Sequence, residues 1–108
     1  MAKTLYIQLA PIRLKDGINE TTLLKASDEF ERNFVSKQKG IVRRQLLRAK
    51  NGGYADLVFF ESKADADRVA KAEATSVECM EFGKIMQMPD ECLPDMGVLS
   101  FEHIRTYD

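Results

Sequence analysis

Hydrophobic and polar residues alternate with a period of two over residues 4–12, which predicts a strand with two unlike faces. Residues 20–38 follow the period of an amphipathic helix instead. The apolar stripe of this helix is formed by Leu23, Ala26, Phe30 and Phe34. Asn19 is well placed as its N-cap, and Gly40 is a typical stop signal beyond its C-terminal end. This part of the chain is therefore expected to form a strand and a long helix.

A second strand over residues 41–50 and a third over residues 54–61 are separated by Asn51-Gly52-Gly53. Asn-Gly between two strand patterns is a strong hairpin signal, because both central residues of the favoured turn adopt positive φ. The two strands are therefore expected to pair as an antiparallel hairpin.

Ser62, followed three residues later by Asp65, predicts the start of a second helix. The helical period breaks near residues 75–76, and a shorter helical stretch follows to Ile85. Residues 88–96 contain two prolines and are expected to form a loop. Residues 98–107 are then expected to form the last strand.

The order strand, helix, hairpin, helix, strand is the split βαβ pattern. It predicts one α+β domain over residues 1–108, with a ferredoxin-like βαββαβ fold. In this fold a four-stranded antiparallel sheet carries its helices on one face. The first and third strands are the most apolar and are expected to be central. The second and fourth carry more charge and are expected to be edges.

Both faces of the two central strands carry large apolar side chains. Tyr6, Val58 and Phe60 share one face, and Leu5, Ile7, Leu57 and Phe59 share the other. Two helices cover only one face of such a sheet, and each large side chain left in water forgoes about 1.5–3 kcal/mol. An apolar surface of this size normally marks an interface. We therefore expect a homodimer formed through the uncovered sheet face.

Composition limits the binding partners and the cellular compartment that we expect for this protein. Lys and Arg total 16 against 17 Asp and Glu, so the basic excess typical of nucleic-acid binding is missing. No apolar run approaches the roughly 20 residues of a membrane span, and no signal peptide is recognisable. Cys79 and Cys92 form no CxxC motif, which favours a reducing, cytoplasmic location. With His103 as the single imidazole, no metal site is expected.

Three local sequences point to a family. They are Gly40-Ile41 with Leu46-Leu47-Arg48 in the second strand, the Asn-Gly hairpin, and residues 54–62, Tyr-Ala-Asp-Leu-Val-Phe-Phe-Glu-Ser, before an Ala-rich helix. Together they resemble the antibiotic-biosynthesis-monooxygenase-like family of dimeric α+β barrels, from about Ile7 to Ile85. The resemblance implies a dimeric barrel. The family's roles are diverse and include cofactor-free oxygenation of aromatics, quinone oxidation and haem degradation.

The departures from the family pattern bear on the cofactor and the site. Phe60 stands where the family often has Trp, and Ala10 and Phe82 stand where its haem-degrading branch has Asn and His. Without an axial imidazole, haem chemistry is not expected, and no cofactor is predicted. The resemblance implies a pocket between sheet and helices, lined here by Tyr6, Gln8, Asp56 and Phe60. Phe82 joins Asp56 and Phe60 as a candidate ligand contact.

The candidate catalytic residues are Tyr6, Gln8 and His103, which could bind or deprotonate a phenolic hydroxyl. Structural explanations stay open beside these roles. Tyr6 and Gln8 could satisfy each other or bind water, and His103 could be structural. Asp56 could pair with an arginine of the neighbouring strand, Arg44 or Arg48. Phe60 and Phe82 could be core residues.

Three functions are therefore weighed. The first is a small-molecule-binding dimeric barrel acting as a cofactor-independent monooxygenase on a phenolic or quinol-type aromatic. The second is a ligand-binding or stress-related dimer without chemistry, so whether the protein is an enzyme stays open. The third is RNA binding, because Leu5-Tyr6-Ile7 and residues 53–59 resemble the sheet motifs of the RNA-recognition motif. Asp56 then stands where a base-stacking aromatic belongs, which disfavours that function.

Overall fold

The computed structural model describes residues 4–50, 52–87 and 97–107 of the 108-residue chain. The elements run in the order β1 (Tyr6–Ile12), α1 (Glu20–Asn33), the 3₁₀ turn η1 (Val35–Lys37), β2 (Ile41–Arg48), β3 (Tyr54–Phe60), α2 (Lys63–Ala74), α3 (Val77–Gly83) and β4 (Leu99–Glu102). None of the helices within these residues is long and apolar enough to cross a membrane.

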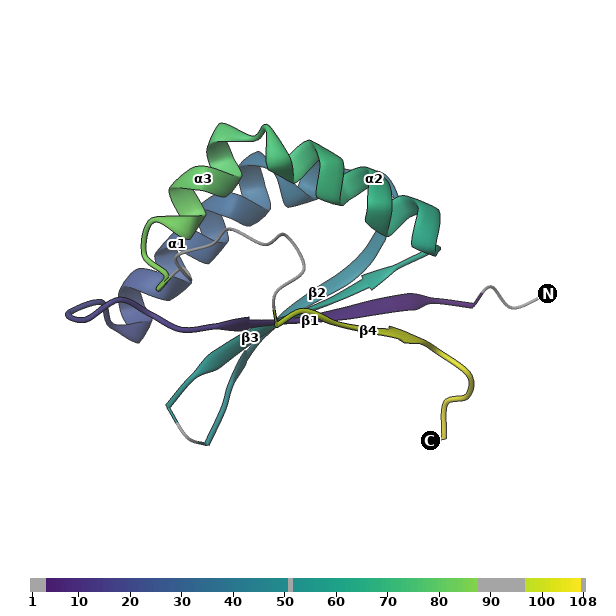
Figure 1. Ribbon diagram of the computed structural model, residues 1–108, viewed down its shortest axis with the longest axis horizontal. Coiled ribbons are helices and arrows are strands. Elements are labelled where there is room, and N and C mark those ends of the chain that lie inside the picture. Colours follow the sequence, from purple (N-terminus) through teal and green to yellow (C-terminus); the bar gives the residue numbers. More distant parts are fainter. Residues whose placement is uncertain (1–3, 51, 88–96, 108) are drawn as a thin grey trace.

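The four strands form one antiparallel sheet in the order β2-β3-β1-β4. All three helices lie on the same side of this sheet (Figure 1). The predicted ferredoxin-like architecture is therefore confirmed. So is the expectation that the apolar strands β1 and β3 are central and the charged strands β2 and β4 are edges.

Side-chain caps explain where the helices begin. Asn19 accepts the backbone N–H of Thr22, and Ser62 accepts that of Asp65, as the sequence predicts. Ser76 accepts the N–H of Cys79. This third cap begins a separate helix, α3, at the break that the sequence predicts near residue 75. Each cap satisfies a backbone donor that the first helical turn leaves free.

The first helix is shorter than predicted from residues 20–38. It ends at Asn33, because Phe34 leaves the helical region with φ −130° and ψ −61°, and η1 follows. Gly40 then adopts a φ of +91°, and a Cβ at this position would collide with the Asp65 side chain. A glycine is therefore required where the chain turns into β2.

The prediction of a last strand over residues 98–107 is wrong in its extent. β4 covers only Leu99–Glu102 and pairs with β1 from Leu9 back to Tyr6. One further backbone bond joins His103 N–H to the Leu5 carbonyl oxygen, and residues 103–107 lie outside any strand. Ile104 and Tyr107 are consequently 92% and 82% exposed. The predicted loop 88–96, with Cys92, lies outside the described residues.

The core lies between the sheet and the helices. Its buried apolar residues are Ile12, Leu23, Phe30, Phe34, Val35, Phe60, Ala66, Val69 and Phe82. Strand register places Tyr6, Gln8, Asp56, Val58 and Phe60 on this covered face, as predicted, because alternate residues of a strand face opposite ways.

The opposite sheet face has no helix over it (Figure 1). Two apolar rows cross it on the paired strands β4, β1 and β3. One row is Phe101, Ile7 and Phe59, and the other is Leu99, Leu9 and Leu57. Phe101 and Leu99 are 48% and 53% exposed.

Candidate functional site

The side chain of Arg44, a residue of β2, reaches toward helix α1 and is only 8% exposed. Its Nη2 atom donates to Asp56 Oδ2 at 3.0 Å and to Ser27 Oγ at 2.9 Å. Its Nη1 atom donates to the Ser27 carbonyl oxygen and to Glu31 Oε1, both at 3.4 Å. The guanidinium thus ties β2 to β3 and α1, and it pairs with two carboxylates.

Two phenylalanine rings also contact this guanidinium. Its Cζ lies 5.3 Å from the Phe30 ring centroid and 5.6 Å from that of Phe82. The rings of Phe30 and Phe82 stack at 4.8 Å between centroids, with 20° between their planes. Cation–π contacts of a desolvated guanidinium are worth more than those at an exposed site, so the rings help to hold Arg44 in place.

Asp56 is 8% exposed and is only half satisfied. Its Oδ2 atom binds Arg44, whereas Oδ1 is buried and has no hydrogen-bond partner among the described residues. Burial raises the pKa of Asp56, although the charge of Arg44 and the hydrogen bond that it donates act in the opposite direction. An unmade hydrogen bond to a buried oxygen costs about 1–3 kcal/mol, more for a charged group. The burial of Asp56 Oδ1 is therefore a cost that no donor among the described residues offsets.

A second carboxylate, Glu73 of α2, approaches the same space. Burial raises the pKa of Glu73, and so does the negative charge of Asp56. The Cys79 thiol donates to Glu73 Oε2 at 3.7 Å. Burial, followed by the charge of Glu73, raises the pKa of Cys79 to about 12, so this thiol stays protonated and is not an activated nucleophile.

These groups surround a small space between sheet and helices that we call the inner cavity, of about 70 Å³. Its polar lining residues are Gln8, Arg44, Asp56 and Glu73. Its apolar lining residues are Phe30, Phe34, Val35, Ile41, Val58, Phe60 and Val69. The cavity thus combines mostly apolar walls with a few convergent polar groups, which is typical of small-molecule sites.

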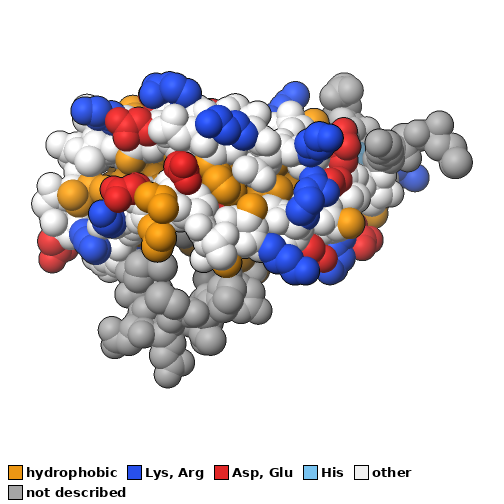
Figure 2. Space-filling model, turned by 90° about the horizontal axis from the view of Figure 1, so that it is seen from above, with side chains coloured by type: hydrophobic (Ala, Val, Ile, Leu, Met, Phe, Trp, Pro, Cys, Tyr) orange, Lys and Arg blue, Asp and Glu red, His pale blue; other side chains and the backbone are white. Residues whose placement is uncertain are grey.

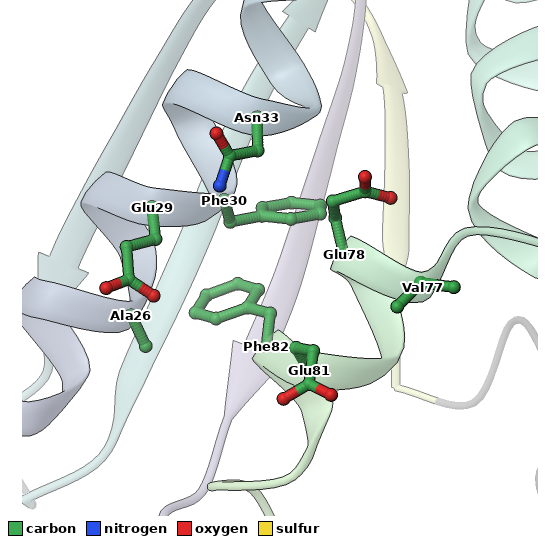
Figure 3. Close-up of a pocket in the computed structure, with 8 residues that line it drawn as sticks. All are labelled: Ala26, Glu29, Phe30, Asn33, Val77, Glu78, Glu81 and Phe82. Atoms are coloured by element: carbon green, nitrogen blue, oxygen red, sulfur yellow. The ribbon is translucent and has the colours of Figure 1, made fainter.

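A second space, the outer groove, lies between α1 and α3 and measures about 210 Å³. Its lining residues are Ala26, Glu29, Phe30, Asn33, Val77, Glu78, Glu81 and Phe82 (Figure 3). The close-up shows the two rings lying face to face between the helices, with the three glutamates around them. Phe30 lines both spaces, so its ring separates the outer groove from the inner cavity, and Phe82 stacks on it from the groove side.

The structure brings some of the predicted site residues together and separates others. Gln8, Asp56 and Phe60 line the inner cavity, whereas Phe82 lines the outer groove and contacts Arg44. Gln8 Nε2 lies 3.4 Å from Ser100 Oγ, a long hydrogen bond. Of the two arginines considered for Asp56, Arg44 is its partner.

Tyr6 and His103 do not join Gln8 at this cavity. Tyr6 is on the same sheet face and packs against the core, but it does not line the inner cavity. His103 stands opposite Leu5 and alternates onto the open face, where its Nε2 atom lies 2.6 Å from Thr106 Oγ1. The sheet separates His103 from Gln8, so the three do not form one catalytic group within a chain, and their individual roles stay predictions.

The positions of Tyr54 and Asp56 in the sheet also bear on the RNA-binding hypothesis. Tyr54 and Asp56, at two working positions of the third-strand motif, lie on the covered face of the sheet. A base cannot stack on residues that helices cover, so these positions do not form a binding platform. Within the described residues no group of three or more His, Cys, Asp or Glu side chains could hold a metal ion.

The sequence did not single out Glu73 or the central role of Arg44. A signal for Glu73 is present, because it follows the buried Val69 by four residues and so falls on the apolar stripe of α2. For Arg44 the signal is weaker. It is one of three arginines in β2, and only the alternation of faces separates it from the exposed Arg43.

The ferredoxin-like architecture is similar to that of several solved structures named as antibiotic biosynthesis monooxygenases. A protein of Bordetella bronchiseptica that bears the provisional name antibiotic biosynthesis monooxygenase superimposes with a TM-score of 0.71, at 12% identity over 97% of this chain and 100% of its own. SnoaB of Streptomyces nogalater, a cofactor-independent oxygenase, superimposes with a TM-score of 0.65, at 10% identity over 99% and 97% of the two chains.

A similarly named protein of Nitrosomonas europaea gives a TM-score of 0.62, at 11% identity over 99% of this chain and 95% of its own. No protein-family model matches the sequence, and no curated protein matches it significantly. At these identities the likeness establishes the fold. The resemblance seen in the sequence is confirmed at that level.

Replacing Arg44 by Leu should lower the free energy of unfolding by about 3–5 kcal/mol at about pH 7, because the buried Asp56 loses its cation. The loss should be smaller at about pH 4. Without Arg44 the pKa of Asp56 in the folded protein rises further, and protonation below that pKa removes the unpaired charge. Urea unfolding followed by circular dichroism measures both values.

Two variants serve as controls for this prediction. Arg48→Leu on the same strand removes a more exposed pair with Glu20, joined at 2.7 Å, and should cost under about 1 kcal/mol. The double variant Arg44→Leu/Asp56→Leu should regain much of the stability lost in Arg44→Leu. Equal losses for Arg44→Leu and Arg48→Leu would contradict the structural role given to Arg44.

Proposed function

We propose that the protein binds a phenolic or quinol-type aromatic with its hydroxyl directed into the inner cavity and oxidises it with molecular oxygen, without a cofactor. The observation that carries the proposal is the buried Oδ1 atom of Asp56, which has no hydrogen-bond partner among the described residues and belongs to a residue in the wall of a mostly apolar cavity. The fold supports it, because a cofactor-independent oxygenase shares the architecture over nearly the whole chain.

In the proposed reaction Asp56 Oδ1 accepts the proton of the phenolic hydroxyl. Burial raises the pKa of Asp56 and so brings this carboxylate nearer to a phenol as a base. Gln8 donates an amide hydrogen bond to the substrate, and the guanidinium of Arg44 stabilises the electron-rich phenolate. The apolar walls keep water away from the reactive anion.

The phenolate then reacts with oxygen directly. One oxygen atom bonds to the ring and the other leaves as water, so that a phenol and one O₂ yield a quinone and one water. The substrate supplies all four electrons through its O–H and C–H bonds. No external reductant is needed.

Oxygen uptake with a panel of electron-rich phenols tests the reaction. We expect consumption proportional to the protein concentration, and one labelled oxygen atom in the quinone when ¹⁸O₂ is used. Asp56→Asn should reduce the rate by about 10²-fold or more, in the range typical of a general base. Gln8→Ala should lower it less, and His103→Ala, on the other sheet face, should leave it near the wild-type rate.

The other outcomes are equally informative. Saturable binding of the phenols without oxygen uptake would replace the proposed oxidation by the ligand-binding alternative. A rate unchanged in Asp56→Asn but lost in His103→Ala would move the chemistry away from the inner cavity. Tight binding of single-stranded RNA at low salt would favour the RNA-binding alternative.

We also propose that two copies pack through their open sheet faces. Two continuous rows of large apolar side chains cross β4, β1 and β3 there, opposite the helices. Leaving such a patch in water forgoes several kcal/mol, and packing it against an identical patch by two-fold symmetry recovers the loss. His103, next to this face, would then lie near the interface and not at the cavity.

Light scattering coupled to size exclusion tests the dimer, with an expected mass of twice the 12.3 kDa chain at micromolar concentration. Phe101→Asp should shift the protein toward monomer, because it places a charge in the apolar row. Leu24→Asp is the matched control, since Leu24 is also 48% exposed but lies on α1. A monomeric wild-type protein would overturn this proposal.

A further inference from the structure

The inner cavity cannot accept an aromatic ring as it stands. Its volume of about 70 Å³ suits a few water molecules, each needing about 30 Å³ in the liquid. The outer groove of about 210 Å³ lies directly behind the Phe30–Phe82 pair. If the Phe82 ring moved aside, the joined space would approach the roughly 300 Å³ at which small-molecule sites begin.

Phe82 is also the side chain best suited to move. It is the only buried residue of α3, whereas Val77 and Met80 of the same helix are 61% and 59% exposed. α3 has only seven residues, and Gly83 is its last. Displacing the ring therefore exposes one side chain and leaves the rest of the core in place.

The outer groove is acidic. Glu29, Glu78 and Glu81 line it, and no Lys, Arg or His does. Nearby cations offset this charge only in part. Lys84 Nζ pairs with Glu81 at 2.8 Å in an exposed bridge. Hydrogen bonds to its own backbone N–H and to Ser76, followed by the charge of Lys37, lower the pKa of Glu78, which favours its ionised form.

The acidic character is a property of the groove lining, whereas the helical surface as a whole carries charges of both signs (Figure 2). Toward the α1–α3 end of the face seen in Figure 2, exposed hydrophobic side chains lie among acidic ones. Lys and Arg side chains lie toward both ends of this face. An approaching anion is therefore repelled at the groove, and a cation is attracted.

We propose that the substrate is a phenol with a positively charged substituent, admitted between α1 and α3. Its hydroxyl reaches Asp56 Oδ1, its ring takes the place of the Phe82 ring, and its cationic group stays among the glutamates of the outer groove. The ring would keep the stacking contact with Phe30 and the guanidinium contact that Phe82 makes now. The inference rests on the proposed function for the role of Asp56, but not on the oxidation step.

Three 4-alkylphenols that differ in charge test this directly. They are tyramine as the cation, 4-(2-hydroxyethyl)phenol as the neutral compound and 4-hydroxyphenylacetate as the anion. Calorimetry on the wild-type protein should show tyramine binding about fivefold tighter than the neutral phenol, as three partly screened charges allow. The anion should bind more weakly than both. Equal affinity across the series would overturn the inference.

Variants locate the source of the preference. The triple variant Glu29→Gln/Glu78→Gln/Glu81→Gln should bring tyramine to the affinity of the neutral phenol, whose own binding should not change. The control Asp16→Asn/Asp28→Asn/Glu102→Gln removes the same charge from exposed positions elsewhere and should keep the preference. If both triple variants lose it equally, net charge and not the groove is responsible, and the inference fails.

The position of the ring is tested by amide chemical shifts and by Phe82→Leu. Tyramine should perturb residues of α3 and the neighbourhood of Phe30, and the smaller Leu should speed ligand association. Perturbations confined to the surface around Ile12 and Tyr54 would contradict the route. Oxygen uptake is scored separately. Charge-ordered binding without uptake would refute the oxidation alone, and uptake without any charge preference would refute the inference alone.

Discussion

One buried guanidinium organises the covered side of the sheet. Arg44 connects β2 with β3 and α1, and it lies against the stacked rings of Phe30 and Phe82. A buried charge is stable only if it is paired, so the position of Arg44 fixes one oxygen of Asp56. The other oxygen is buried without a donor among the described residues, in a residue that lines the inner cavity. The same carboxylate therefore pairs with Arg44 through one oxygen and is proposed to bind the ligand through the other. A ligand hydroxyl at Asp56 would also lie close to the guanidinium of Arg44.

The two faces of the sheet separate two tasks. The covered face holds the core and the inner cavity, whereas the open face carries the apolar rows proposed as the dimer interface. Strand alternation enforces this division, because neighbouring residues cannot serve both faces. It also explains why Gln8 and His103, both reasonable partners for a phenol in sequence terms, lie on opposite sides of the sheet.

Much of the fold follows from local pattern. The hydrophobic periods, the caps at Asn19 and Ser62 and the hairpin signal place nearly every element, and the apolar content of β1 and β3 predicts the strand order. The extent of β4 could not be predicted, because it depends on its pairing with Tyr6–Leu9 of β1 and not on its own hydrophobic pattern. The same limit applies to the site. Asp56 and Phe60 could be named from the sequence, but the pairing of Arg44 with Ser27 and Glu31, and the approach of Glu73, depend on how α1 and α2 cross the sheet.

The central claim is that Asp56 presents a free acceptor to a ligand. Carboxyl ¹³C resonances followed through a pH titration measure this directly, with the Asp56 signal assigned by its loss in Asp56→Asn. The account predicts that the pKa of Asp56 lies above the ordinary aspartate range in the free protein. It also predicts that a phenol moves this resonance saturably and lowers the pKa, because a donated hydrogen bond favours the charged form. A pKa at or below the ordinary range, with no response to any phenol, would contradict it.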